Sequence, residues 1–513
     1  MTTSGHVSLI GAGPGDPGLI SVQGLRLLSL ADVVIYDRAV SNLLRWARPD
    51  AEKIEAGAPA EGTMAQDALS MLIADKAREG LTVARLKWGD PFVFDSGGKE
   101  ALFLHEQRIP FDVVPGIPAA VGASAYAGIP LTYPGSGDAV VLLRGSEGGS
   151  DALPDVDWGA LARLDGTIVC DVTGRLGAAI LTALVAHGRD SGSPAALVYS
   201  GTLTSQRTVG HTIADLLAHM ADGQDTGAAT LIVGEVASLR QHLRWFDERP
   251  LFGKRIIITR SRDQAHELAD QLEELGAQTI EAPIFRMAPA DDPEAMDRAA
   301  ASIDAYQWVI FTSTNAVTRF FSALLSGPRD MRAMGNVSVC AIGPTTAERI
   351  EARGVKPDVV MREARLEELV DALGAAGSLE SQRVLIVRPD FQRDTLAVEL
   401  ARHGASVTDL VAYTTMSATP ESADAQDIYK QLLEGRVDAV TFMSPTAVRR
   451  FASLIGSEQA ADLLRTTVVA ALGPVTAEAA EQLGITAQIV PQKFTIEALV
   501  ASLVAHFHAR PSR

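Results

Sequence analysis

Short runs of apolar residues alternate with longer amphipathic stretches over residues 7–240. The runs VSLIG and ADVVIYD have the length and the β-branched content of strands. Two further stretches, Val22–Leu30 and Met64–Glu79, repeat their apolar residues with helical spacing. This alternation predicts layers of helices on sheets, an α/β fold, for the front half of the chain.

The back half of the chain contains a long internal repeat. Three segments recur in the same order at an offset of about 130 residues. The pairs are residues 253–283 with 381–411, 308–321 with 439–452, and 339–355 with 469–485. Each copy again alternates β and α patterns. Because this length suits a small domain, we expect two similar lobes and a binding cleft between them.

Two stretches containing Pro and Gly interrupt these patterns. One is WFDERPLFG (Trp245–Gly253), directly before the first copy of the repeat, and the other is SEGGSDALPDVDW (Ser146–Trp158). We therefore predict a front domain of residues 1–246 and a back domain of residues 253–513. The front domain would divide into subdomains of about 1–135 and 136–246.

Composition narrows the choice of partners. The chain has 513 residues and a formal net charge of −18, and it has no run of Lys or Arg. We therefore expect neither nucleic acid nor an anionic membrane surface as a partner. Cys170 and Cys340 are the only cysteines and lie in separate apolar runs, which predicts two buried thiols in a cytoplasmic protein and no Cys-rich metal site. The chain shows neither a signal sequence nor the roughly 20 apolar residues of a membrane span.

A glycine-rich loop, GAGPGD (Gly11–Asp16), follows the strand VSLI and precedes a helix. Its glycines let the backbone approach a nucleotide-like ligand. The loop lacks the G-x-G-x-x-G spacing of dinucleotide-binding proteins, although Asp37 after the strand VVIY is placed like a ribose-binding acid. From these residues alone, a ligand site and a plain strand-to-helix turn both stay open.

Several segments of the front half occur together in a distinctive order. They are VSLIGAGPGDPG, ADVVIYDRAVS, VARLKWGDPFVF, FDVVPGIPAAV, SAYAGIPLT, ALVYSGT followed by QR, and TLIVGEVASLR. Over nearly all of residues 7–245 the chain thereby resembles the tetrapyrrole methylase family, most closely the uroporphyrinogen-III C-methyltransferases. The resemblance implies a two-subdomain α/β fold, usually dimeric, with S-adenosylmethionine between the subdomains. By position it implies cofactor contacts at Pro14, Gly89, Asp90, Val93, Ala119 and Gly201, and a proton acceptor at Asp37.

This half also departs from the family pattern. Trp88 replaces the first Gly of Gly-Gly-Asp-Pro, where an indole would fill part of the pocket, and Ala58 replaces the Lys proposed as a proton donor. Other basic or cofactor-lining positions are replaced by Tyr133, Pro134, Ser146, Asp171 and Val172. A polycarboxylate substrate needs charge-assisted donors, which Arg38 and Arg144 would restore in part. An active methylase and a noncatalytic module for binding or dimerisation therefore both stay open.

Four related loops in the back half end apolar strands and begin helices. They are Thr312–Asn315, Gly343–Thr346, Met443–Thr446 and Gly473–Thr476. Each offers hydroxyls and free backbone N–H groups where the helix dipole favours an anion. Any one of them can be an ordinary N-cap. Because both copies carry them, we expect a polyanionic ligand, with Arg260 and Arg388 as weaker candidate contacts.

The segments GKRIIITR, WVIFTSTNAV, AIGPTTAE, VLIVRPD, VAYTT, VTFMSP, ALGPVTAE and FTIEALV also follow a known order. Over residues 253–507 the chain resembles uroporphyrinogen-III synthases. The resemblance implies two flavodoxin-like lobes with an interleaved chain path, about 253–285 plus 414–513 and about 286–413. It also implies cyclisation of the linear tetrapyrrole hydroxymethylbilane, with loss of water and inversion of the last ring.

The same resemblance suggests roles for single residues. Tyr413 matches a tyrosine suspected of assisting departure of the hydroxyl, although it could equally be a tyrosine that only packs. We expect Ser313, Thr346, Ser444 and Thr476 to contact the substrate carboxylates. The sequence of the repeat shows neither a nucleophile paired with a general base nor a cluster of metal ligands. His403 and His506 are expected to be surface residues. We expect no metal, and whether the product serves heme, siroheme or cobalamin synthesis stays open.

Overall fold

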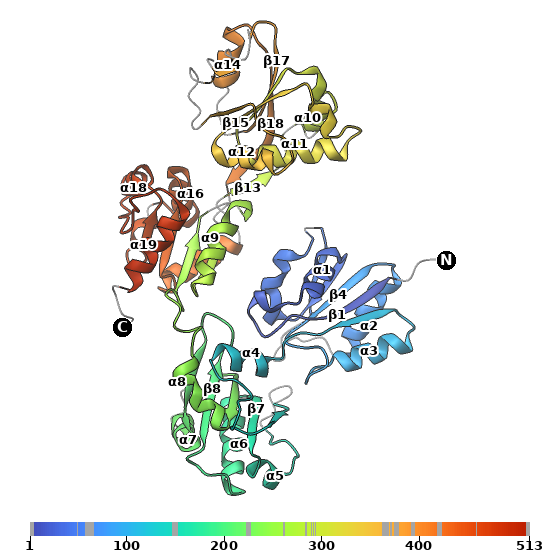
Figure 1. The fold of residues 1–513 in the computed structure, drawn as a ribbon, viewed down its shortest axis with the longest axis vertical. Helices are drawn as coiled ribbons and strands as arrows, with labels where there is room; N and C mark the ends of the chain where they lie inside the picture. The colour runs from blue at the N-terminus through green and yellow to red at the C-terminus, as the bar shows by residue number, and fades with distance from the viewer. Residues whose placement is uncertain are drawn as a thin grey trace. The chain divides into compact units, whose positions relative to one another are not determined.

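The computed structural model of the chain is shown in Figure 1. It describes residues 5–48, 50–56, 66–145, 152–221, 227–259, 262–282, 285–288, 290, 292, 294–361, 369, 372–373, 379–390, 395–417, 423–457 and 459–508. Contacts divide the chain into two compact units: residues 1–255, 270–278 and 504–513 form the first, and residues 256–269 and 279–503 form the second. No helix within the described residues is long and apolar enough to cross a membrane.

The first sheet is fully parallel and carries the glycine loop at the end of its strand β1. Its order is β3 (Glu52–Glu55), β2 (Val33–Tyr36), β4 (Thr82–Lys87), β1 (His6–Gly11) and β5 (Phe111–Val114). Its α-helices are α1 (Val22–Leu30), α2 (Gln66–Arg78), α3 (Gly97–Glu106) and α4 (Ala119–Tyr126). Two 3₁₀ helices, η1 (Pro17–Leu19) and η2 (Arg38–Trp46), complete this half of the front domain. The helix predicted over Val22–Leu30 is thus confirmed.

The second sheet of the front half is mixed. Its order is β6 (Ala139–Leu143), β7 (Gly166–Val172), β10 (Ala229–Val233), β8 (Pro194–Tyr199) and β9 (Arg207–Thr212). Only β6 and β7 pair in parallel, and the other neighbours are antiparallel. Its helices are α5 (Trp158–Ala162), α6 (Gly174–Ala186), η3 (Glu235–Leu239), α7 (Ile213–Ala221) and α8 (Arg240–Leu243). The α/β fold predicted from the alternating pattern is therefore confirmed in both sheets.

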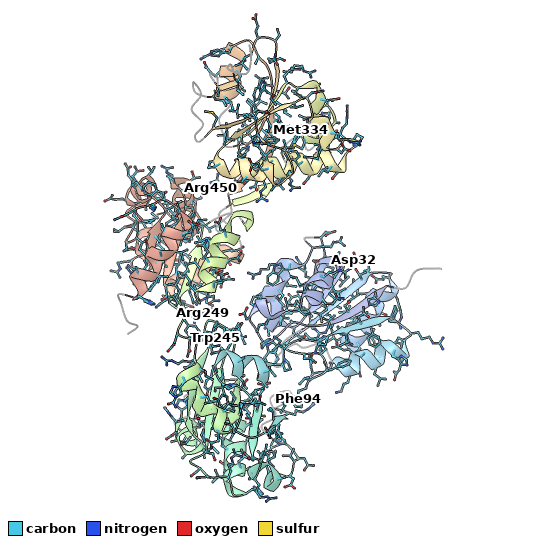
Figure 2. All side chains as sticks on the ribbon, in the orientation of Figure 1. Asp32, Phe94, Trp245, Arg249, Met334 and Arg450 are labelled. Carbon is cyan, nitrogen blue, oxygen red and sulfur yellow. The ribbon has the colours of Figure 1, made fainter. Side chains whose placement is uncertain are left out.

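The stretch after α8, in which the sequence predicts a boundary, is densely packed. Phe246 is 2% exposed, and its ring meets Tyr126 at 4.7 Å and Phe252 at 5.3 Å, both edge-on. The Arg249 guanidinium lies over the rings of Trp245 and Phe246, at 4.9 and 5.1 Å. Figure 2 labels Trp245 and Arg249 close to each other. The first compact unit accordingly continues through this stretch to residue 255. The domain bounds given above remain a prediction.

The third and fourth sheets are built from the repeat. The third has the order β12 (Gln278–Glu281), β11 (Arg255–Ile258), β19 (Ala439–Phe442) and β20 (Val468–Ala471). The fourth has the order β13 (Phe285–Ala288), β18 (Ser406–Ser417), β17 (Arg383–Pro389), β14 (Trp308–Phe311), β15 (Ser338–Ile342) and β16 (Val359–Met361). The helices of the repeat are α9 (Arg262–Glu274), α10 (Glu294–Ala301), η4 (Ile303–Ala305), α11 (Thr314–Ser326), η5 (Met331–Met334), α12 (Pro344–Glu351), α14 (Thr395–Arg402), α15 (Ala423–Leu433), α16 (Pro445–Ile455), α17 (Ala460–Leu463), α18 (Pro474–Glu481) and α19 (Ile496–His508).

The two copies exchange strands. The first strand of copy one, β11, pairs with β19 of copy two, with Ile256 opposite Ala439. The first strand of copy two, β17, pairs with β14 of copy one, with Val309 opposite Leu385. Each sheet is therefore made from both copies, and the predicted interleaved chain path is confirmed.

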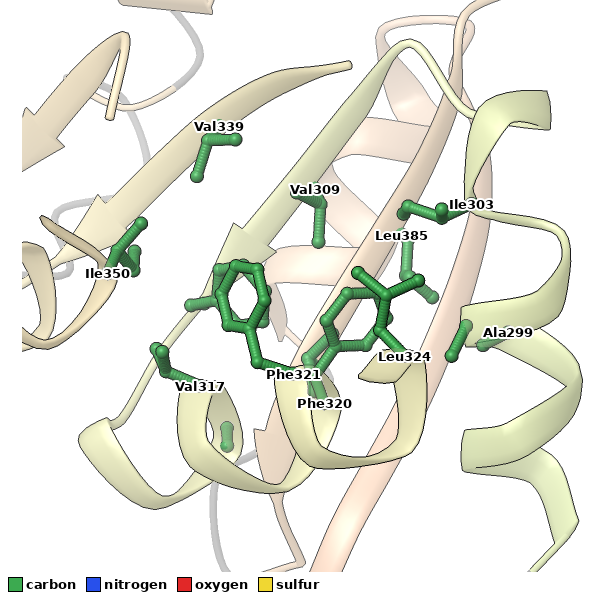
Figure 3. Packing of buried hydrophobic residues seen from close by; sticks show 14 of the residues in the cluster. Ala299, Ile303, Val309, Val317, Phe320, Phe321, Leu324, Val339, Ile350 and Leu385 are labelled. Atoms are coloured by element: carbon green, nitrogen blue, oxygen red, sulfur yellow. The ribbon is translucent and has the colours of Figure 1, made fainter. Parts of the chain in front are cut away.

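Equivalent apolar residues form the cores under both repeated helices. In α11 the buried stripe is Ala316, Val317, Phe320, Phe321 and Leu324, and Figure 3 shows its phenyl rings between α11 and the strands that carry Val309 and Leu385. In α16 the equivalent stripe is Ala447, Val448, Phe451, Ala452 and Ile455. Because these residues recur with helical spacing, the sequence pattern indicates which face of each helix is buried.

Candidate functional site

The glycine loop pairs directly with the turn that follows β4. Gly89 N–H donates to Gly13 O at 2.8 Å, and Gly13 N–H donates to Gly89 O at 3.2 Å. Both residues have positive φ, 79° at Gly13 and 70° at Gly89, a conformation that a side chain would strain. These two turns bring together Pro14, Gly89 and Asp90, three of the predicted cofactor contacts.

Asp90 holds this turn in place through its carboxylate. One oxygen accepts from Phe92 N–H at 2.8 Å, and the other accepts from Gly116 N–H at 2.9 Å. The half-buried Val93 follows in the same turn, with its N–H donating to Asp90 O at 3.4 Å. Asp90 therefore shapes the backbone of the site, whatever further contact it makes with a ligand.

Helix α4 and the loop after β8 close on the glycine loop. A Cβ added at Gly122 would lie 2.5 Å from Cγ of Pro14, and one added at Gly201 would lie 2.4 Å from Cβ of Ala123. Ala119, the first residue of α4, is 7% exposed, and its nitrogen would lie 3.8 Å from a Cβ added at Gly89. The six predicted cofactor residues therefore lie on neighbouring turns that small residues allow to approach.

Asp37 is held by a buried cation and a backbone donor. Its Oδ1 lies 2.7 Å from Nη2 of Arg85, and its Oδ2 accepts from Trp88 N–H at 3.0 Å. Arg85 is 2% exposed and also lies 3.4 Å from the fully buried Glu100, which pairs with Lys87 at 3.0 Å. Burial raises the pKa of Glu100, but Arg85 and Lys87 lower it by more. This buried charge network fixes the direction of the Asp37 carboxyl group.

Trp88 covers part of the glycine loop. Its indole Nε1–H donates to Pro14 O at 3.0 Å, and the residue remains 40% exposed. The sequence predicts an indole that fills part of a pocket, and the ring does lie against Pro14, one of the predicted cofactor contacts.

The other positions that differ from the family pattern have separate surroundings. Val172 is 4% exposed in the core of the second sheet, and Tyr133 is 47% exposed. Burial raises the pKa of Asp171, which accepts from Thr230 Oγ1–H at 2.7 Å. Pro134 is exposed. Ala58 and Ser146 lie outside the described residues.

Arg38 and Arg144, which we expect to replace some of the lost charge-assisted donors, each have a neighbouring side chain. Arg38 Nε donates to Glu55 at 2.6 Å in an exposed pair, and Arg144 lies 5.7 Å from the ring of Phe94. The Arg38 pair is exposed, and such a pair contributes little to stability.

In the repeat, two of the predicted substrate contacts are serine N-caps. Ser313 Oγ accepts from Ala316 N–H at 3.1 Å at the start of α11, and Ser444 Oγ accepts from Ala447 N–H at 3.2 Å at the start of α16. Each serine uses its oxygen as an acceptor, which leaves its O–H able to donate to a carboxylate. Ser313 follows β14 of the fourth sheet, and Ser444 follows β19 of the third.

Thr346 and Thr476 lie in the first turns of α12 and α18. They are 3% and 5% exposed, so their hydroxyls are more enclosed than the half-buried serines. The preceding Gly343 has φ of 95°, whereas its counterpart Gly473 has an extended φ of −159°. Only the first copy therefore needs a glycine before this helix.

Tyr413 lies next to Ser313. Its hydroxyl is 3.4 Å from Ser313 Oγ, and the residue is 5% exposed. The register of β17 with β18 shifts here, because Val411 lies opposite Arg388 and Tyr413 opposite the next residue, Pro389. Such a bulge changes the direction of a side chain at the end of a strand. The structure thus brings together two residues that the sequence predicts separately.

Two protein-family models match the chain, one in each half. The family model described as Tetrapyrrole (Corrin/Porphyrin) Methylases matches residues 6–217, and the model described as Uroporphyrinogen-III synthase HemD matches residues 266–501. A porphyrin biosynthesis protein HemD of Ruminiclostridium josui is 33% identical over 509 residues, which cover 98% of each chain. The chain belongs to these porphyrin biosynthesis proteins, which join a methylase domain to a synthase domain.

Other relatives are similar to part of the chain. A siroheme synthase of Neisseria meningitidis serogroup C is 46% identical over 246 residues, 48% of this chain and 50% of its own. A uroporphyrinogen-III C-methyltransferase of Bacillus subtilis is 33% identical over 362 residues, 69% of this chain and 74% of its own. The resemblances noted from the sequence motifs are thereby confirmed for both domains.

Sequence reasoning missed one neighbour of Tyr413 in the synthase domain. The Arg319 guanidinium lies 5.7 Å from the Tyr413 ring centroid. The repeat contains a signal for it, since AVTRFF and AVRRFA place Arg319 and Arg450 at equivalent positions. Arg388, one of the weaker candidates for a substrate contact, forms a two-point ion pair with Asp409 at 2.7 Å. Arg260 lies outside the described residues.

The two cysteines of the protein are buried and free, as predicted. Burial raises the pKa of each thiol to about 12. Burial thus disfavours the thiolate form of both cysteines, which is the form that acts as a nucleophile. His403 is exposed, and its ring contacts Glu399 O in the preceding turn of α14, in agreement with a surface position.

Proposed function

We propose that the synthase domain cyclises hydroxymethylbilane to uroporphyrinogen III, with loss of water and inversion of the last pyrrole ring. The observation that carries this proposal is the match of the synthase family model to residues 266–501 of this chain, together with a porphyrin biosynthesis protein HemD that is similar over 98% of it. The polycarboxylate substrate suits the hydroxyl and N–H donors at the starts of α11, α12, α16 and α18.

Tyr413 is the proposed acid of this reaction. As the C–O bond of the substrate breaks, its pyrrole nitrogen supplies electrons, and the departing hydroxyl takes the phenol proton and leaves as water. Ring closure then releases a proton from the attacked pyrrole, which restores the phenol. Most of the rate would come from holding the chain ends in a ring-closing geometry. The support for Tyr413 is its hydroxyl beside Ser313 Oγ, 3.4 Å away at a strand end.

We also propose that the methylase domain binds S-adenosylmethionine at the glycine loop and methylates the uroporphyrinogen III made by the synthase domain, giving precorrin-2. Support comes from the predicted contacts Pro14, Gly89, Ala119 and Gly201, which lie on adjoining turns. Asp37, oriented by Arg85 at 2.7 Å, would accept the proton lost from the substrate. The competing possibility, a noncatalytic module for binding or dimerisation, is favoured by Trp88 on Pro14.

One assay separates these possibilities. Purified protein receives hydroxymethylbilane with and without S-adenosylmethionine, and the products are separated by chromatography. We expect type III uroporphyrinogen without the cofactor and precorrin-2 with it. Type III uroporphyrinogen in both samples would reject the methylase activity, whereas only the spontaneous type I isomer would reject the synthase activity.

Calorimetry with S-adenosylhomocysteine examines the pocket itself. We expect Trp88→Gly to tighten binding by about tenfold, because removal of the indole uncovers Pro14 and restores room above the loop. Equal affinities would show that the indole lies outside the ligand's path. Trp158→Phe provides a control, because it removes an indole at the start of α5, against the core of the second sheet and away from the glycine loop.

A further inference from the structure

Four hydrogen bonds join the glycine loop to the loop after β8 through helix α4. Asp16 N–H donates to Thr202 Oγ1 at 3.1 Å, and Thr202 N–H donates to Gln206 Oε1 at 2.9 Å. Gln206 Nε2–H donates to Tyr126 O at 3.2 Å, and Tyr126 O–H donates to Asp16 Oδ2 at 2.7 Å. The four residues Asp16, Tyr126, Thr202 and Gln206 thus form a closed ring, which we call the clamp.

The clamp holds a strained backbone. Thr202 has φ of 70° and Ser200 has φ of 49°. A residue with a branched Cβ rarely adopts this left-handed conformation, and such outliers persist where the surrounding structure holds them. Thr202 is 2% exposed and Gln206 is 5% exposed, so water cannot easily replace these hydrogen bonds.

The strained segment surrounds one of the predicted cofactor contacts. Gly201 lies between Ser200 and Thr202, and a Cβ on it would lie 2.4 Å from Cβ of Ala123. On the other side of the clamp, a Cβ on Gly15 would lie 3.1 Å from Thr202 Oγ1. The hydrogen bonds therefore determine how closely the backbone at Gly201 approaches the glycine loop.

The Tyr126 hydroxyl is a stable hydrogen-bond donor to Asp16. Burial, and then the hydrogen bond to Asp16, raise the pKa of its phenol, so the O–H is retained across the physiological pH range. Asp16 completes the arrangement, because its other oxygen accepts from Gly18 N–H at 2.8 Å and shapes the turn η1. Each polar group of the clamp thereby has a defined direction.

We propose that the clamp positions Gly201 and the glycine loop to receive S-adenosylmethionine. This inference rests on the proposed cofactor site. The four clamp residues act as positioning residues: they hold the two loops at the separation that the ligand requires. Loss of one hydrogen bond lets the Gly201 segment relax from its strained conformation, and binding then has to restore that conformation.

Calorimetry of the full-length protein with S-adenosylhomocysteine tests the clamp. Thr202→Val keeps the branched shape but removes the acceptor of Asp16 N–H, and Tyr126→Phe keeps every ring contact but removes the donor. We expect each variant to bind about tenfold more weakly. Thr202→Ser retains the hydroxyl and should stay within about threefold of the unaltered protein. Thr182→Val, which removes an exposed hydroxyl on α6, serves as the matched control.

The outcomes are distinguishable. A lower melting temperature with unchanged affinity in both Thr202→Val and Tyr126→Phe would overturn the clamp as a positioning device and leave the cofactor site standing. No binding by the unaltered protein would overturn the cofactor site and the clamp's role together. If Thr202→Val does not fold, Tyr126→Phe alone answers the question. Because both bonds belong to one ring, the double variant should lose less than the two single losses combined.

Discussion

The two copies of the repeat build nearly the same loop and surround it differently. Ser313 and Ser444 have φ of −159° and −158°, and each caps its helix through a bond of 3.1 or 3.2 Å. Behind each cap, Phe320 and Phe451 fill the core at 0% exposure. Ser313, however, lies beside the Tyr413 hydroxyl. Tyr413 belongs to the second copy, and the equivalent position in the first copy is Phe285, which has no hydroxyl.

This difference separates what the fold needs from what the reaction needs. The caps and the buried stripes recur because any helix at that place requires them. The phenol occurs once, at a bulge of the fourth sheet. Changes to the shared parts should therefore affect stability alike in both copies, whereas changes near Tyr413 should affect catalysis.

The largest effect is expected in the shared core. Phe320→Ala and Phe451→Ala should each lower the free energy of unfolding by about 3–5 kcal/mol, because each leaves a cavity under its helix. Urea denaturation followed by circular dichroism measures the loss, with the transitions of the two units fitted separately. Losses that differ by more than about 2 kcal/mol would show that the cores are not equivalent.

Removal of the phenol should break the symmetry of the two copies. Tyr413→Phe is expected to lower kcat of the synthase reaction by about a hundredfold, the lower end of what a general acid contributes. The melting temperature should hardly change, since the ring stays buried. Tyr429→Phe is the control: it removes a hydroxyl that donates to Gln459 at 3.1 Å on α15, and its rate should match the unaltered protein. A similar rate in Tyr413→Phe would leave this tyrosine with a packing role only.

Loss of the serine N-cap in either copy of the repeat should have a smaller effect on stability and should distinguish the two copies by their kinetics. Ser313→Ala and Ser444→Ala should each cost about 1 kcal/mol of stability, because Ala cannot accept from the helix N–H. Their kinetics should differ: Ser313→Ala lowers kcat through its contact with Tyr413, and Ser444→Ala raises KM through a lost carboxylate donor. The same kinetic change in both variants would contradict separate roles for the two loops.

The smallest effect is expected at Arg319. Its guanidinium lies 5.7 Å from the Tyr413 ring, so in the proposed reaction it would favour the negative charge left on a phenol that gives up its proton. Arg319→Gln should lower kcat about threefold, worth roughly 0.6 kcal/mol, and Arg319→Lys should restore most of it. Arg332→Gln removes a 92% exposed cation paired with Asp330 and provides the control. If Arg319→Gln lowers kcat by the same factor in the Tyr413→Phe background, the arginine acts independently of the phenol.

The sequence allowed much of the fold and part of the site to be predicted. Periodicity located α1 and the buried faces of α11 and α16, because apolar spacing along one helix is a local property. Motifs pointed to Pro14, Gly89 and Gly201, which do lie on adjoining turns. The neighbours of these residues were not predictable, since nothing in the segment VARLKW indicates that Arg85 meets Asp37.

Capping and burial patterns depend on residues within a few positions of each other, so the chain specifies them wherever the helix forms. The exchange of strands between the two copies and the closure of the clamp depend instead on groups far apart along the chain, such as Asp16 and Thr202, 186 positions apart. Those contacts form only when whole sheets are packed, because a single hydrogen bond cannot offset the entropy of closing so long a loop. Local patterns therefore specify the helices and their caps, and long-range packing decides which of the candidate residues meet.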